Sequence, residues 1–104
     1  MTWHVLSEAS SENNGNPRWF EVQLAKRDDE YRVVMTGVST IPGETNRIRT
    51  EVTTSPHAVV DFLALGSPGS RYIPKVSRKA LHEAGDRDQA LADALDDFDT
   101  VTSR

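Results

Sequence analysis

The chain has 104 residues, a formal net charge of −4 and no cysteine, which suits one domain over residues 1–104 and excludes disulfides, thiolate zinc sites and a cysteine nucleophile. No apolar stretch reaches the roughly 18 residues that a membrane-spanning helix needs, and the N-terminal residues carry neither the basic region nor the hydrophobic run of a signal peptide. We therefore expect a single cytoplasmic domain without a membrane partner.

The first half of the chain, residues 3–54, is expected to be mostly β. An extended segment at 3–6 precedes a loop at 7–17 that is rich in Ser, Asn and Gly. Residues 18–26 alternate with period two, as a half-buried strand does. One face of that strand carries Phe20, Val22 and Leu24, and the other carries Trp19, Glu21 and Gln23.

Two further strands are predicted after the polar residues 27–30. Residues 31–38 are rich in β-branched and aromatic side chains and complete a hairpin. Pro42-Gly43 marks a turn, and residues 47–54 alternate again. We expect Ile48, Thr50 and Val52 on the covered face of the sheet, with the arginines and the glutamate of this segment on a wet outer face.

The second half, residues 55–100, is expected to be mostly helical. Ser55 can cap a helix whose first residue is Pro56, and Gly66 can stop it. A loop follows at 66–74 and a short helix at 77–84. The last helix is expected to begin at Asp86, with Gln89 in the capping-box position. Its apolar stripe is expected to pack on the sheet, and comprises Ala90, Leu91, Ala94, Leu95 and Phe98.

The order of strands followed by helices predicts the fold class. We expect an α+β fold, in which an antiparallel β-meander of three or four strands is followed by two or three C-terminal helices packed on one face. Neither an internal repeat nor a domain boundary interrupts the pattern.

No catalytic constellation is recognisable. His4, His57 and His82 fall in different predicted elements and in no metal-binding spacing. The serines lack the turn motif that exposes a nucleophile. We therefore expect no enzyme, no metal site and no cofactor.

Acidic residues and one tryptophan are the candidate protein-binding residues. Residues 83–99 hold seven acids against the single Arg87. Within the last helix, Asp93, Asp96 and Asp97 lie away from the centre of the apolar stripe and could form a docking face. Trp19 lies opposite the apolar face of its strand, where it is either an exposed anchor or covered by another segment.

A basic segment offers an alternative site. Residues 71–79 contain four cations and no acid, which gives them some capacity to bind phosphates. This alternative nucleic-acid-binding or anion-binding set consists of Arg71, Tyr72, Lys75, Arg78 and Lys79.

The leading functional hypothesis is a small non-enzymatic interaction or regulatory module that binds another protein. One alternative is an acidic nucleic-acid mimic, such as an anti-defence inhibitor from a mobile element. The other is weak nucleic-acid binding through residues 71–79, which the negative net charge disfavours. The sequence identifies neither the partner nor the oligomeric state.

Overall fold

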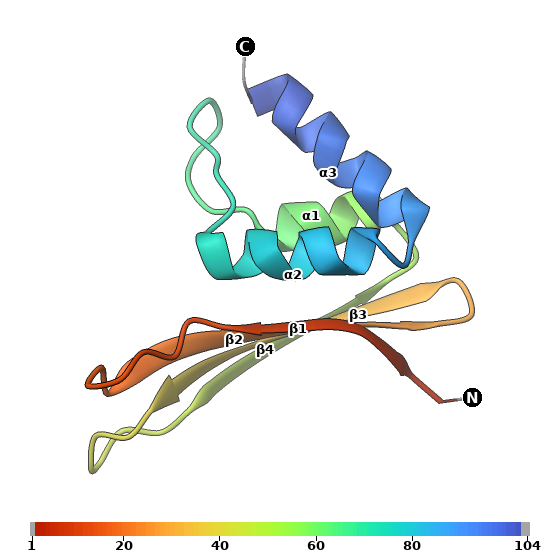
Figure 1. Cartoon of the computed structure of the whole chain (residues 1–104). Coiled ribbons are helices and arrows are strands. Elements are labelled where there is room, and N and C mark those ends of the chain that lie inside the picture. Colours follow the sequence, from red (N-terminus) through yellow and green to blue (C-terminus); the bar gives the residue numbers. More distant parts are fainter. Residues whose placement is uncertain (1, 103–104) are drawn as a thin grey trace.

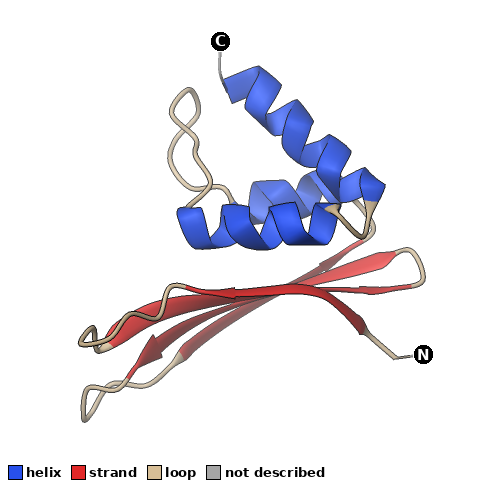
Figure 2. Cartoon of the chain, viewed as in Figure 1, coloured by secondary structure: helices blue, strands red, loops and turns tan. Residues whose placement is uncertain are grey.

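The computed structural model describes residues 2–102 and has the predicted α+β architecture. Four antiparallel strands form one sheet in the order β1-β2-β3-β4, and three helices follow (Figures 1 and 2). Within the described residues, no helix is long and apolar enough to cross a membrane. The elements are β1 (His4–Ser10), β2 (Arg18–Arg27), β3 (Glu30–Ser39), β4 (Arg47–Thr53), α1 (Pro56–Leu63), α2 (Lys75–Gly85) and α3 (Gln89–Thr102).

The first strand differs most from its prediction. β1 continues to Ser10, through residues that the sequence analysis assigns to the 7–17 loop. The register with β2 shifts between Val5 and Ser7, which interrupts the alternation that reveals a strand. Ser7 is buried and its hydroxyl donates to the carbonyl of Ala80 at 2.7 Å. This small polar residue therefore belongs to the sheet because α2 satisfies its hydrogen bond.

The β2–β3 hairpin has the shortest connection in the sheet. Arg27 pairs with Glu30, so only Asp28 and Asp29 turn the chain. Asp28 has a φ of 53°, in the left-handed region that aspartate tolerates better than most residues. The register runs without a shift from this turn to the Arg18–Ser39 pair.

The ends of the helices follow local capping chemistry, with two corrections. The Ser55 hydroxyl caps α1 by accepting from the backbone N–H of Ala58, as predicted. However, α1 ends at Leu63, and Gly66 lies beyond it in the loop with a φ of 95°. The cap of α3 is Asp88 rather than Asp86: its Oδ1 accepts from the N–H of Leu91 at 3.2 Å.

The helices form two layers above one face of the sheet (Figure 1). α2 lies over β1 and β2, whereas α1 lies over β3 and β4. α3 packs against α1 and α2, and its stripe does not lie on the sheet as the sequence analysis expects. A methyl group on Gly85 would stand 3.1 Å from that of Ala92, so this glycine lets α3 cross α2 closely. Burial of the Leu91 and Leu95 side chains depends on the other helices.

The apolar core lies between the sheet and the first helix layer and continues up to α3. The sheet supplies side chains such as Val22, Leu24 and Val33, which are almost completely buried. The loop before α2 adds Ile73. The helices contribute Val59, Val60, Leu63, Leu81, Leu91 and Leu95.

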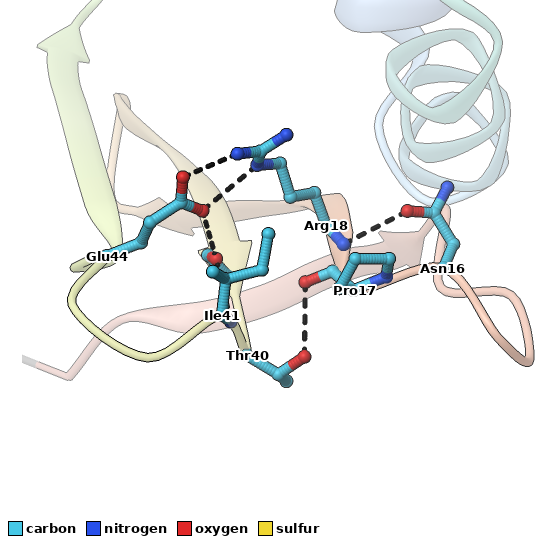
Figure 3. Close-up of polar contacts among 7 residues, drawn as sticks. Asn16, Pro17, Arg18, Thr40, Ile41 and Glu44 are labelled. Carbon is cyan, nitrogen blue, oxygen red and sulfur yellow. Dashed lines mark hydrogen bonds and ion pairs between the residues drawn. The ribbon is translucent and has the colours of Figure 1, made fainter.

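The end of the sheet that carries the 11–17 and 40–46 loops projects beyond the helices (Figure 1). Polar contacts connect these loops, as Figure 3 shows. Arg18 donates to both carboxylate oxygens of Glu44, at 3.0 and 2.5 Å. Hydrogen bonds from Arg18 and Ser39 lower the pKa of Glu44 to about 2. The Thr40 hydroxyl donates to the carbonyl of Pro17, so this uncovered end is held by polar contacts rather than by a core.

Candidate protein-binding surfaces

The sheet has one face under the helices and one face, here called the open face, on which none of the helices within residues 2–102 packs. The strand registers place Val5, Ile48 and Val52 on the open face, since each pairs with a residue that points away from the helices. Their exposed fractions are 50%, 67% and 46%. The open face therefore presents aliphatic side chains to solvent from both edges of the sheet.

The orientation of β4 corrects a prediction. Ile48 and Val52 were expected under the helices, but they lie on the open face. The register pairs Glu51 with Val33 and Arg49 with Met35. Because directly paired residues share a face, the charged side chains of β4 lie on the helix side. There the guanidinium of Arg49 lies 5.0 Å from the ring centre of Phe62.

Trp19 lies on the open face. As alternation along β2 predicts, it points away from Val22 and Leu24, which face the core. It pairs with Val38 of β3 and is partly exposed. Its indole Nε1–H donates to Glu21 at 2.9 Å. The helices therefore do not cover Trp19, and the indole ring is held in place by a neighbour on its own strand.

A shallow concavity of about 370 Å³ crosses β1, β2 and β3. Its open-face lining includes Glu8, Glu21 and Gln23, together with Val34 and Thr36. Both glutamates are exposed, and Gln23 donates to Glu8 at 2.8 Å. This part of the open face is therefore acidic at its edge and partly apolar in its floor.

Trp3 is a further open-face aromatic residue that the sequence analysis does not single out. The guanidinium groups of Arg27 and Arg32 lie 4.3 and 4.9 Å from its ring centre. Cations over an indole face are attracted by the ring quadrupole. Trp3 precedes β1 whereas both arginines flank the β2–β3 turn, so no local spacing in the sequence brings the three together.

The three acidic candidates lie on the exposed side of α3, as expected. Asp93 accepts from Gln89 at 2.9 Å, and Asp97 lies 2.8 Å from Nε2 of His57. Asp96 is likewise exposed. A second concavity, of about 470 Å³, lies beside Asp97 and His57, between α1, the loop before α2 and the end of α3.

Two other acids of the last helix region do not belong to that solvated side. Asp99 forms a two-point ion pair with Arg78 of α2, at 2.9 and 3.0 Å. Asp88 is buried, and accepts from Lys26 at 2.6 Å and from the hydroxyl of Tyr31 at 3.0 Å. The seven acids of residues 83–99 therefore do not form one continuous acidic face.

The environment of Asp88 explains its ionisation. Burial by itself raises the pKa of Asp88, but hydrogen bonds from Lys26, Tyr31 and the N–H of Leu91 outweigh burial and leave that pKa below the usual aspartate value. The hydrogen bond to Asp88 in turn raises the pKa of Lys26. This cluster connects α3 to β2 and β3 and acts as a structural tie.

The basic candidates are divided between internal contacts and the surface. Arg71 lies 3.3 Å from a carboxylate oxygen of Asp61, and Arg78 is paired with Asp99. The exposed members of the set are Tyr72, Lys75 and Lys79. Two of the four cations thus already face carboxylates of the same chain.

Across residues 2–102, no group of three or more histidine and carboxylate side chains is arranged to hold a metal ion. Comparisons with protein-family models, with characterised proteins and with solved structures find no match to this chain.

Proposed function

We propose that this chain is a small non-enzymatic module that binds another protein through the open face of its sheet. The observation that carries the proposal is the orientation of β4, which presents Ile48 and Val52 to solvent while Arg49 and Glu51 lie on the helix side. Exposed aliphatic side chains on a regular sheet are a favourable surface for protein association.

The energetic argument rests on what a partner would bury. Covering an exposed valine or isoleucine contributes about 1.5–3 kcal/mol per side chain. Trp19 adds an aromatic group of the type that dominates binding energies, and its hydrogen bond to Glu21 limits the freedom lost on binding. The open face thus combines apolar area with an ordered anchor.

The charges on the open face suggest the chemistry of the partner. Glu8 and Glu21 stand at the concavity across β1 to β3. A lysine or arginine of the partner could enter between them while neighbouring aliphatic residues cover Val5 and Ile48. We therefore propose a partner surface with an aliphatic patch beside a basic residue.

The test compares the proteins that the wild-type chain and its variants retain from the native host, each hit being remeasured with purified components. Val5→Ser together with Ile48→Ser removes two aliphatic groups of the open face. Val101→Ser is the matched control, because Val101 is 70% exposed but lies on α3. We expect the double variant to weaken binding of the purified partner by about tenfold or more and the control to leave it unchanged.

A third arm addresses the acidic side of α3. Asp93, Asp96 and Asp97 are replaced by Asn together, which leaves the open face intact. A partner lost in this variant and retained by the double serine variant would overturn the open-face proposal and favour a basic partner on α3. Equal retention by all variants would also contradict the proposal.

A further inference from the structure

We propose that two copies of this chain form a symmetric dimer by antiparallel pairing of their β4 strands, so that the two sheets become one continuous sheet. This inference shares Ile48 and Val52 with the proposed function but does not depend on it, since it rests on the backbone groups at the free edge of β4 and on the Arg49–Glu51 charge pair. It rests on the backbone groups and the side-chain order of β4.

β4 is the regular edge of the sheet. The strand order places β1 and β4 at the two edges. The pairing of β1 with β2 is shifted between Val5 and Ser7, and such irregularities blunt an edge. The pairing of β4 with β3 runs from Arg47 to Thr53 without a shift. A regular edge strand can accept another strand over its whole length.

The register shows which backbone groups of β4 point to the free edge. The N–H of Thr40 donates to the carbonyl of Pro17 at 2.9 Å, at the end of the β2–β3 pair. Because backbone groups point to alternate neighbours along a strand, the even-numbered residues of β3 bond to β2 and the odd-numbered ones to β4. Val33 and Met35 therefore bond to Glu51 and Arg49. The N–H and C=O groups of Ile48, Thr50 and Val52 point to the free edge.

The side chains of β4 are complementary to themselves in one register. With the two-fold axis at Thr50, Arg49 of each copy faces Glu51 of the other, on the helix side. On the open face, Ile48 of each copy faces Val52 of the other. Opposite charges and apolar residues placed directly across from each other stabilise a strand pair. The outward backbone groups of both copies then meet in one hydrogen-bonded ladder.

The neighbouring registers are disfavoured. The outward backbone groups of the two copies stay opposite each other only if the two-fold axis passes through a residue. The two registers next to the proposed one therefore have the axis at Arg49 or at Glu51. With the axis at Arg49, two arginines face each other, and with the axis at Glu51, two glutamates do. Like charges directly opposite destabilise a strand pair. The order of residues in β4 therefore selects the axis at Thr50.

The charges of β4 remain open to such a partner. Charged side chains on an edge strand commonly prevent pairing between sheets. Here Arg49 and Glu51 carry opposite charges and neutralise each other across the two-fold axis, whereas Arg47 faces the uncharged Thr53. Among residues 2–102 neither Arg49 nor Glu51 forms an ion pair. The guanidinium of Arg49 lies 5.0 Å from the ring centre of Phe62, on its own chain. Because Arg49 and Glu51 exchange places across the two-fold axis, this pair is self-complementary, as an isologous interface requires.

The test measures the mass of the full chain by sedimentation equilibrium over a range of concentrations. The wild-type chain is expected to sediment at twice its 11.6 kDa mass at high concentration. Arg49→Glu and Glu51→Arg each place like charges across the axis and should raise the dissociation constant about tenfold or more. Combining both changes in one chain restores opposite charges and should recover the wild-type constant.

Mixing the two single variants provides a second measurement, in which the proposal predicts that a dimer forms rather than that dimerisation is lost. Each copy of the Arg49→Glu chain is complementary to a copy of the Glu51→Arg chain at both charge pairs, so the mixture should form a heterodimer visible by native mass spectrometry. Glu8→Arg on β1 is the control and should dimerise as the wild type does. A monomeric wild type, single variants that dimerise normally, or a mixture without heterodimer would each overturn the proposal.

Discussion

Strands β2 and β4 have the same alternating pattern and opposite surroundings. In β2 the apolar residues Val22 and Leu24 are buried under the helices, whereas in β4 the apolar residues Ile48 and Val52 face solvent. Alternation determines which residues share a face, but not which face is covered. The comparison shows that a pattern typical of a half-buried strand also occurs where neither face is deeply buried.

The reason is the register that β4 takes from β3. Val33 is completely buried, and its partner in β4 is Glu51. β4 lies at the edge, and all its residues from Arg47 to Val52 are exposed, on both faces. Placing the charged side of β4 on the helix side therefore desolvates no charge completely, and the aliphatic side is left free for a partner.

The largest expected effect contrasts the two strands directly. Leu24→Ala should lower the free energy of unfolding by about 2–5 kcal/mol, because it opens a cavity in the core. Ile48→Ala should change it by no more than about 0.5 kcal/mol, as at other exposed sites. Urea denaturation at low protein concentration measures both values without a contribution from dimerisation. Similar losses in the two variants would mean that β4 is covered.

The next effect concerns Asp88, the buried cap of α3 that accepts a hydrogen bond from Lys26 of β2. Asp88→Ala removes the partner of Lys26 and Tyr31 and the cap of α3. It should cost about 1–3 kcal/mol, because buried polar groups lose their hydrogen bonds. Asp86→Ala is the matched control, since Asp86 is exposed and does not cap α3. If the two variants were equally stable, Asp88 would not be the tie between the helix and the sheet.

The pH dependence of the free energy of unfolding should reflect the contacts of Asp88 with Lys26 and Tyr31. The pKa of Asp88 is lowered on folding, so its contribution is present above the unfolded value of about 3.9 and is lost as the pH falls through the folded pKa. The wild-type free energy of unfolding should therefore decrease on acidification below about pH 4. In Asp88→Asn and in Lys26→Met this decrease should be smaller. Denaturation curves that change with pH in parallel for all three chains would contradict this assignment.

The smallest expected effect lies on the outer side of α3. Replacing Asp93, Asp96 and Asp97 by Asn should alter stability by no more than about 0.5 kcal/mol. A slight increase is expected, because Asp93 repels Asp96 and Asp97 at the i,i+3 and i,i+4 positions of α3. Thermal and urea unfolding together check this. A loss above about 1 kcal/mol would show that the contact between His57 and Asp97 holds α1 to α3.

The candidate binding residues illustrate how far the sequence reaches. Alternation predicted that Trp19 lies opposite Val22 and Leu24, but it left open whether that face is exposed or covered. The exposed positions of Asp93, Asp96 and Asp97 followed from helical spacing. By contrast, the sequence analysis places Ile48 and Val52 on the covered face. The pattern within β4 does not show how this strand pairs with β3, and that pairing decides which face of β4 turns to the helices. The burial of Asp88 was not predictable, since its partners Lys26 and Tyr31 are distant in the sequence.

The sequence by itself determined the α+β class, the meander of strands, the cap at Ser55 and the division into a β half and an α half. These features depend on local backbone preferences and on periodicity within single segments. Only the tertiary structure decided that β4 presents Ile48 to solvent, that Asp88 is buried and that α3 forms a separate layer. Each of these features depends on how segments far apart in the chain pack and pair. The free energy gained by burying side chains in the whole fold outweighs the local conformational preference of any one segment.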